Sequence, residues 1–195
     1  ICTFPSLNIN IESFPIIKSY FEEIGKERLE QSGNKGSRKK TSNKWFETQD
    51  SISYWQEFAC PKIIWGEISD KPKFSYDEQG YYAEATTFFM TGDNLKFLLA
   101  ILNSKLSEWY FNLIGTTTGM GTNRWKKYKI ELLPIKFPKN TQLVELIEDV
   151  VNKILNKKTK NPEDNTIDLE FKLDDLIFEL YGLNKEEIKI IKESV

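Results

Sequence analysis

Histidine is absent from this sequence of 195 residues, and cysteine occurs only twice, at Cys2 and Cys60. The lack of histidine excludes most transition-metal sites, and it excludes the Ser-His-Asp and Cys-His arrangements of nucleophilic hydrolases. The two cysteines are far apart and neither has a CxxC neighbour. We therefore expect buried thiols, with neither a disulfide nor a zinc site.

Long apolar runs are lacking as well. No stretch of about 18 apolar residues could span a bilayer, and no basic-then-apolar leader precedes the first predicted element. We therefore expect a protein of the cytoplasm. The chain begins with Ile1 and not with Met, which leads us to expect a piece of a longer protein.

Signatures of catalysis are also missing. The chain has no Asn/Asp-Pro-Pro-Tyr motif and no glycine-rich strand-to-helix turn for S-adenosylmethionine. Glu67 and Asp70 lie near Lys71 without the Asp…Glu-x-Lys spacing of magnesium-dependent nucleases, and we interpret them as surface acids. We predict that this chain has no catalytic residue, no metal site and no bound cofactor.

The composition is that of a folded protein, with 39% hydrophobic and 13% aromatic residues. A net charge of −2 argues at first against a nucleic-acid partner, which requires a basic face. The charge is uneven, however. Residues 1–137 hold 18 Lys and Arg against 16 Asp and Glu, whereas residues 138–195 hold 9 against 13. The basic residues of the first part are also clustered, which favours a basic face on that part.

Hydrophobic periodicity predicts an α+β fold with a small, twisted, mostly antiparallel sheet, packed helices and a C-terminal helical hairpin. The predicted strands cover residues 62–69, 73–76, 81–90 and 125–133. The first three should form an antiparallel meander with a turn at residues 77–80. The predicted helices cover residues 13–31, 93–114, 141–156 and 167–181, and a short last helix should begin with a capping box of Asn184 and Glu187.

Local signals refine these boundaries. We expect Ser13 to cap the first helix, with Pro15 in its first turn, and Asp93 to cap the second, which should end at a left-handed Gly115. The Gly-, Ser-, Asn- and Lys-rich segment up to Lys44 is predicted to be a mobile loop. The composition becomes acidic and helical near residues 138–140. We therefore predict a first domain over residues 1–138 and a helical tail over residues 139–195.

Residues 61–137 resemble a known family. The matching pieces, in order, are Pro61-Lys62-Ile63-Ile64, Lys73-Phe74, Thr86-Thr87-Phe88-Phe89, Leu102-Asn103-Ser104-Lys105 and Leu132-Leu133-Pro134-Ile135. In this order and spacing the chain resembles the TaqI-like C-terminal specificity domain, the DNA target-recognition module of adenine-specific methyltransferases and of fused type II restriction-modification enzymes. Weaker similarity extends the resemblance to roughly residues 13–192.

The resemblance implies that residues 1–138 select a DNA sequence in the major groove and present a target adenine to a methyltransferase domain that flips the base out. Its implied partners are double-stranded DNA and a methyltransferase domain, in the same chain or in a partner subunit, against which the tail would pack. S-adenosylmethionine and Mg²⁺ would be bound by other domains of the parent. Two alternatives stay open: half of a type I specificity subunit, and a protein-interaction module without DNA binding.

Two basic segments are the main candidate DNA contacts. In the segment TTTGMGTNRWKKYK, small residues allow close backbone approach to a phosphate, and Arg124 has the planar fork that reads guanine O6 and N7. The lysine-rich loop would bind phosphates by charge alone, and two lysines near residue 72 are a third contact. The alternative for each is a solvated surface with ordinary lysines. The predicted DNA-binding residues are Lys35, Arg38, Lys39, Lys40, Lys44, Lys71, Lys73, Thr116, Thr117, Thr118, Thr122, Asn123, Arg124, Trp125, Lys126 and Lys127.

Several aromatic residues could stack on bases. They are Tyr54, Trp55, Trp65, Tyr81, Tyr82 and Trp125. Most alternate with polar residues in predicted strands, and we interpret those as core. Trp125 is the exception, because it lies between Arg124 and Lys126, and we expect it at the DNA interface.

Overall fold

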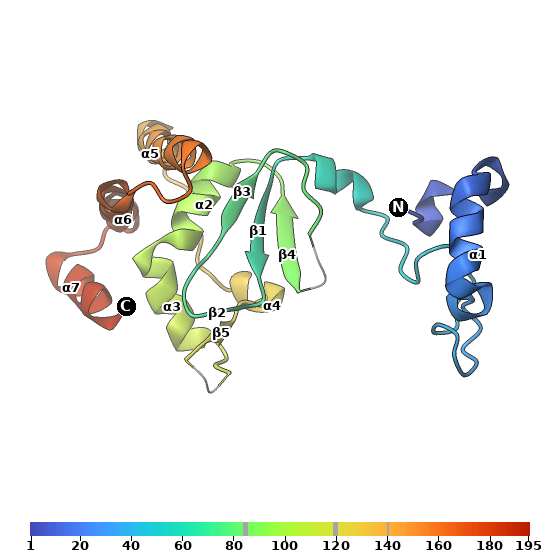
Figure 1. Ribbon diagram of the computed structural model, residues 1–195. Helices are drawn as coiled ribbons and strands as arrows, with labels where there is room; N and C mark the ends of the chain where they lie inside the picture. The colour runs from blue at the N-terminus through green and yellow to red at the C-terminus, as the bar shows by residue number, and fades with distance from the viewer. Residues whose placement is uncertain (84–85, 119–120, 140) are drawn as a thin grey trace. The chain divides into compact units, whose positions relative to one another are not determined.

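The computed structural model of the protein describes residues 1–83, 86–118, 121–139 and 141–195. The chain forms two compact units, Ile1–Glu57 and Phe58–Val195. The elements within these units confirm the predicted α+β class (Figure 1). Three sequence predictions include positions outside the described residues: the strand over 81–90, the candidate DNA-binding segment TTTGMGTNRWKKYK and the boundary at 138–140.

The N-terminal unit contains two 3-10 turns, η1 (Pro5–Leu7) and η2 (Ile11–Ser13), and the helix α1 (Pro15–Leu29). Pro15 opens α1, as predicted, because a first-turn residue needs no backbone donor. The prediction that Ser13 caps α1 is wrong, since Ser13 ends η2 and Phe14 is the N-cap residue. Gly25 has a φ of 109°, which kinks α1 near its end.

The segment after α1 is held by polar side chains. Buried Gln31 donates from its amide to the Glu47 carbonyl at 2.8 Å and accepts from the Thr41 hydroxyl at 2.5 Å. The Asn43 amide donates to two further carbonyls at 3.0 Å. The segment is thus held by hydrogen bonds, and its mobility stays a prediction. The sequence offered no apolar anchor there, and the anchors are hydrogen bonds instead.

The C-terminal unit begins within η3 (Trp55–Ala59), which crosses from the first unit into the second. Its main sheet has the order β3-β1-β4, with β1 (Lys62–Gly66) antiparallel to both β3 (Ser75–Asp77) and β4 (Thr87–Thr91). The predicted meander is wrong in its order, because β1 is the central strand. β1 is also the most buried strand, which fits a central position.

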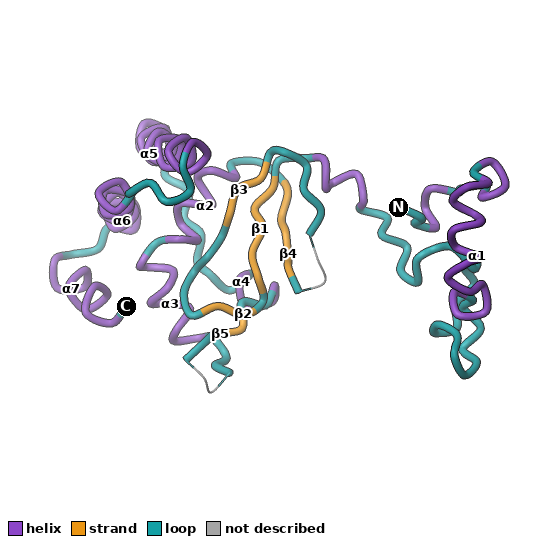
Figure 2. Tube along the Cα trace, viewed as in Figure 1, coloured by secondary structure: helices purple, strands orange, loops and turns teal. Residues whose placement is uncertain are grey.

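A second, two-stranded sheet pairs β2 (Ile68–Ser69) with β5 (Asn123–Arg124). The predicted strand over residues 62–69 is thus divided at Glu67 between two sheets. The strand predicted over residues 125–133 is wrong, because this segment forms the short helix α4 (Lys127–Ile130). Its buried residues, Ile130 and Leu133, are three positions apart, which is a helical and not a strand spacing. Figure 2 shows how short these strands are beside the loops that join them.

The long helix predicted over residues 93–114 is two helices, α2 (Leu95–Asn103) and α3 (Lys105–Ile114). Ser104 separates them, and its hydroxyl accepts from the Ser107 amide as the N-cap of α3. The predicted cap Asp93 is wrong, because Asn94 is the residue before α2. Gly115 is extended and not left-handed; a Cβ there would lie 2.7 Å from the Phe111 carbonyl oxygen.

The C-terminal helices are α5 (Thr141–Lys160), α6 (Ile167–Tyr181) and α7 (Lys185–Ser194). The helical pair and the Asn184–Glu187 capping box are as predicted. Helix α2 lies between the main sheet and the α5–α6 pair, and α7 lies beside α3 (Figure 1). Ile63 of β1, Ile101 of α2 and Ile147 of α5 belong to one core cluster. The tail therefore shares a core with residues 58–138, and the boundary at 138–140 stays a prediction.

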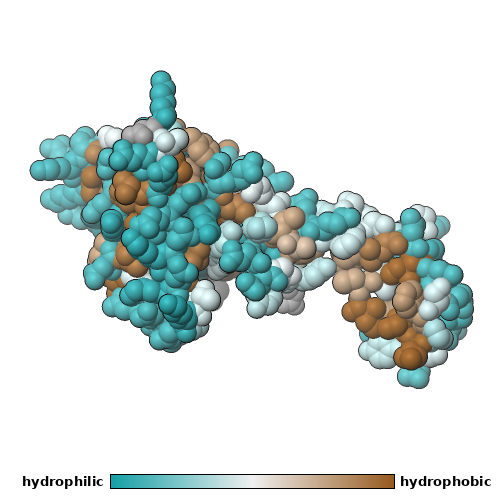
Figure 3. Space-filling model, turned by 90° about the horizontal axis from the view of Figure 1, so that it is seen from above, coloured by the Kyte–Doolittle hydropathy of each residue, from teal (hydrophilic) through white to brown (hydrophobic). Residues whose placement is uncertain are grey.

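Surface composition differs between the units. Figure 3 shows apolar residues gathered on the N-terminal unit, where α1 has no buried residue and Ile16, Tyr20 and Ile24 are exposed. Cys2 and Cys60 are both exposed, so the expectation of buried thiols is wrong. Within the described part of the chain, none of the helices has the length and apolar character needed to cross a membrane.

Candidate functional site

Residues 67–73, 116–118 and 121–127, joined by the pairing of β2 with β5, form a surface that we call the basic ribbon. The register places Ile68 opposite Arg124 and Ser69 opposite Asn123. The Trp125 amide donates to the Glu67 carbonyl at 2.6 Å, and the Arg124 amide donates to the Thr116 carbonyl at 3.0 Å. The structure therefore brings together two predicted DNA contacts that are about 50 residues apart in the sequence.

Trp125 is buried at the base of the ribbon, with 1% of its surface exposed. Its ring stacks on Phe111 with centroids 3.8 Å apart and meets Phe74 edge-on at 5.8 Å. Its indole nitrogen donates to the Ser69 carbonyl at 3.1 Å. The expectation of an exposed, base-stacking Trp125 is wrong. Its charged neighbours are exposed because they alternate with it along extended backbone.

Arg124 and Lys126 lie on the opposite side of the chain from Trp125 and converge on one carboxylate. Arg124 Nη1 lies 2.9 Å from Glu67 Oε1, and Lys126 Nζ lies 3.7 Å from the same oxygen. The Arg124 side chain is 44% exposed and that of Glu67 is 26% exposed. The prediction that Glu67 is an ordinary surface acid misses this pairing. The strand register that brings it to Arg124 could not be read from the sequence.

The threonine-rich part of the ribbon has both exposed and internal groups. Thr116 and Thr117 are exposed, whereas the hydroxyls of Thr118 and Thr122 lie 2.6 Å from each other. Asn123 is only 8% exposed and donates its amide to Asn112 Oδ1 at 2.7 Å. Asn123 is therefore a structural residue of the ribbon, in contrast to its predicted place at the surface.

The lysines that follow β2 differ in their surroundings. Lys73 is paired with Asp70 at 2.6 Å, and this hydrogen bond holds the pKa of the Asp70 carboxyl at about 2. Lys71 is exposed and, among the described residues, forms no ion pair. Lys127, on α4, makes a longer and exposed pair with Glu131 at 3.7 Å. Lys71 and Lys127 therefore have the most available charges of the ribbon.

The other predicted contacts, residues 35–44, belong to the N-terminal unit, and we call them the basic loop. Arg38 donates from Nε to the Leu29 carbonyl at 2.7 Å and from Nη2 to the Trp45 carbonyl at 2.6 Å. Lys44 donates to the Ile9 carbonyl at 3.1 Å. These two cations are used by the fold itself. Lys44 is exposed nonetheless, as are Lys35, Lys39 and Lys40.

The remaining aromatic candidates divide between core and surface. Trp65 is buried, as expected, and its indole donates to the Trp125 carbonyl at 2.8 Å. Tyr54, Tyr81 and Tyr82 are exposed, which contradicts the interpretation as core. Tyr81 follows the turn at Asp77, whose carboxylate accepts from the Tyr81 amide at 3.0 Å. That turn removes residues 81–83 from the strand in which alternation would have buried them.

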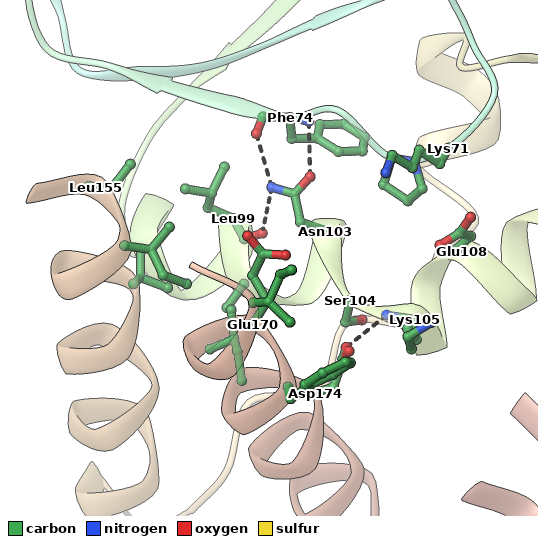
Figure 4. Close-up of a pocket in the computed structure, with 17 residues that line it drawn as sticks. Lys71, Phe74, Leu99, Asn103, Ser104, Lys105, Glu108, Leu155, Glu170 and Asp174 are labelled. Atoms are coloured by element: carbon green, nitrogen blue, oxygen red, sulfur yellow. Dashed lines mark hydrogen bonds between the residues drawn. The ribbon is translucent and has the colours of Figure 1, made fainter. Parts of the chain in front are cut away.

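A cavity of about 510 Å³ lies between the loop after β2, the α2–α3 junction, α5 and α6 (Figure 4). The Asn103 side-chain amide accepts from the Phe74 backbone amide at 3.0 Å and donates to the Phe74 carbonyl at 2.9 Å. The Asp174 carboxylate accepts from the Lys105 backbone amide at 2.8 Å. Burial raises the pKa of Asp174 and of Glu108. Within the described residues no cluster of acids, histidines or cysteines could hold a metal ion. Asn103 and Asp174 thus fasten the loop and helices that line the cavity.

Comparison with known proteins shows the family of the chain. The sequence model of the TaqI-like C-terminal specificity domain matches residues 9–135, and the chain belongs to this family. The chain is also similar to the type II methyltransferase M.BstVI of Geobacillus stearothermophilus, with 24% identity over 189 residues. This alignment covers 96% of the chain and 31% of that protein. The chain therefore spans about a third of the length of this relative.

Proposed function

We propose that this chain is the DNA target-recognition domain of an adenine-specific methyltransferase from a type II restriction-modification system. In this proposal the basic ribbon docks in the major groove, selects the sequence and places the target adenine for a methyltransferase domain that flips it out. Membership of a specificity-domain family supports the proposal. The observation that carries it is the geometry of the ribbon. Trp125 is buried, and the side chains of its two neighbours, Arg124 and Lys126, lie at the surface beside Glu67.

The ribbon has the chemistry that DNA recognition requires. Exposed lysines such as Lys71 and Lys127 can neutralise phosphates, and the hydroxyls of Thr116 and Thr117 can donate to phosphate oxygens. Arg124 adds a planar donor that can bind a guanine edge with two hydrogen bonds. Because the net charge of the chain is −2, DNA binding has to come from such local surfaces.

The rest of the proposal concerns the parent protein. S-adenosylmethionine and Mg²⁺ would be bound by other domains, one of them a methyltransferase domain that contacts the helical tail. We also propose that the parent protein contains a fused endonuclease. The alignment of nearly the whole chain to a part of a type II methyltransferase supports a type II parent over the alternative of a type I specificity subunit. The sequence that flanks these residues in the parent would discriminate the two.

The proposal is tested by the affinity of the chain for a labelled mixed-sequence duplex, measured by fluorescence anisotropy between about 50 and about 200 mM salt. We expect affinity to fall steeply with salt. Removing the cations of Arg124, Lys126 and Lys127 together should weaken binding. A matched variant that removes Lys157, Lys158 and Lys160 from the end of α5 should not. Equal losses in the two variants would remove the special role of the ribbon, and the absence of salt-dependent binding would favour a protein-interaction module instead.

A second test concerns the absence of chemistry that the sequence predicts. The chain alone, incubated with duplex, Mg²⁺ and S-adenosylmethionine, should neither cleave nor methylate the DNA. Turnover that scales with the concentration of the pure chain would show that catalytic groups lie within these residues.

A further inference from the structure

Glu67 has an unusual position in the basic ribbon. It lies between β1 of the main sheet and β2 of the ribbon, and its backbone is fixed on both sides. Its amide donates to the Thr86 carbonyl at 3.0 Å, and its carbonyl accepts from the Trp125 amide at 2.6 Å. The carboxylate is not needed for these bonds. It is directed instead to the two cations that flank Trp125.

The geometry of the arginine explains what this carboxylate can do. A guanidinium group has five N–H donors in one plane. Within the described chain, the side chain of Arg124 has one hydrogen bond, from Nη1 to Glu67, and 44% of its surface is exposed. One donor of the plane is therefore held, while the side chain remains partly open to solvent. An arginine fixed in this way loses less conformational freedom when it binds a guanine edge.

The charge of the carboxylate has a second effect. Arg124 and Lys126 both pair with the same Glu67 oxygen, so one negative charge partly offsets two positive charges. A phosphate that approaches this cluster meets less attraction than two unpaired cations would provide, and it is repelled by the carboxylate. A guanine edge, which is neutral, is not affected by this repulsion in the same way. Discrimination can therefore increase while non-specific affinity falls.

We propose that Glu67 is a positioning residue that sets the specificity of the ribbon, by orienting Arg124 toward a guanine edge and by weakening its attraction to phosphate. This inference rests on the proposed function, because it requires the chain to bind DNA through the ribbon. Glu67 itself does not contact the base. It acts through Arg124, and its effect should therefore vanish when Arg124 is removed.

The test uses the full chain and a duplex pool with a randomised centre, from which the preferred sequence is selected. Affinities are then measured for the selected duplex and for a scrambled one. Glu67→Ala should lower the ratio of these affinities about fivefold, the upper range for a partly exposed ion pair, and should raise affinity for the scrambled duplex. Glu67→Gln, which keeps an acceptor for Arg124 without the charge, should retain more of the ratio.

A matched control is Glu131→Ala, which removes the same charge from the exposed Lys127 pair on α4. It should leave the ratio unchanged. Thermal unfolding of Glu67→Ala should stay close to that of the unmodified chain, because its backbone bonds remain. A purely structural role would lower both affinities and the unfolding temperature together, which would overturn the inference.

The decisive step is a double-mutant cycle. In an Arg124→Ala background, Glu67→Ala should have no further effect on the affinity ratio. An undiminished effect would show that Glu67 acts through another group and would overturn the inference, as would an unchanged ratio in the single variant. If the unmodified chain shows no preference and no salt-dependent binding, the proposed function itself fails. The two failures are therefore distinguishable.

Discussion

The basic loop and the basic ribbon have similar composition and different construction. In the loop, Arg38 is bound to two backbone carbonyls, and the exposed lysines extend from a backbone held only by polar groups. In the ribbon, Trp125 is buried against Phe111, and the cations beside it are fixed by a carboxylate. Charged groups on flexible lysine side chains can bind the phosphates of DNA of any sequence, whereas recognition of a base requires a hydrogen-bond donor in a fixed position.

This difference teaches which cations can contribute to specificity. Lys39 and Lys40 are exposed lysines in a segment that has no buried apolar anchor between residues 32 and 44. Arg124 pairs across the strands with Ile68, and the next residue in the chain, Trp125, is buried. If the chain binds DNA as proposed, we expect the loop to provide general affinity and the ribbon to provide discrimination. Substitutions in the two segments test this division.

The largest expected effect comes from removing the anchor of the ribbon. Trp125→Ala should destabilise the C-terminal unit by about 3–5 kcal/mol, because a buried aromatic ring that stacks on Phe111 is lost. Urea unfolding followed by circular dichroism would measure this. Tyr128→Ala, at an exposed aromatic three residues later, should change stability by less than about 0.5 kcal/mol. Similar effects of the two substitutions would contradict a buried anchor.

A smaller effect is expected from the anchor of the loop. Arg38→Ala removes hydrogen bonds to the Leu29 and Trp45 carbonyls and should destabilise the loop by about 1.5–3 kcal/mol, the range for a charged donor. Hydrogen exchange of the Arg38 and Thr41 amides, which donate to Glu30 and Gln31, would report it. Lys39→Ala serves as the control and should leave their protection unchanged. Fast exchange in the unmodified chain would contradict a held loop.

The DNA affinity of the loop should depend on charge alone. Lys39→Ala combined with Lys40→Ala should weaken binding to every duplex alike and reduce the slope of log affinity against log salt by about 1.8, if each lysine neutralises one phosphate. Titrations at several salt concentrations would measure the slope. A loss confined to the preferred sequence would break the comparison, since it would give the loop a reading function.

The smallest effect is expected at Lys73, which forms an ion pair with Asp70. The hydrogen bond from Lys73 keeps the Asp70 pKa at about 2, so Lys73→Ala should raise this pKa toward the ordinary value of about 3.9. An NMR titration of the carboxyl carbon would show the shift. Because Lys71 has no such pair among the described residues, Lys71→Ala should weaken DNA binding more than Lys73→Ala. The reverse order would show that the Asp70 pair opens on DNA.

The sequence predicted the periodic parts of this fold well. Helices α5 and α6 were predicted because apolar residues such as Ile147 and Val150 recur at helical spacing, and the Asn184 capping box is a local signal. The helix break at Ser104 was missed because the apolar pattern continues through it. A serine can occur within a helix or at its cap, and only packing decides which.

The candidate site could be predicted only in part. The segment around Arg124 was identified from its basic and small residues, but Trp125 was expected to be exposed because its neighbours are charged. Its burial depends on Phe74 and Phe111, which tertiary packing brings to it. The Glu67 partner depends on strand register, and the α4 helix depends on which face of residues 127–133 meets the core. Neither is a local property of the sequence.

The most direct test of the division between loop and ribbon is the affinity ratio of a selected duplex to a scrambled duplex in Arg124→Ala. We predict that this substitution reduces discrimination by about 1–3 kcal/mol, the value of a bidentate guanine contact, while the double substitution at Lys39 and Lys40 leaves the ratio unchanged. Equal losses on both duplexes for Arg124→Ala would make it a phosphate contact and contradict the account. No loss on either duplex would remove the ribbon from the DNA interface.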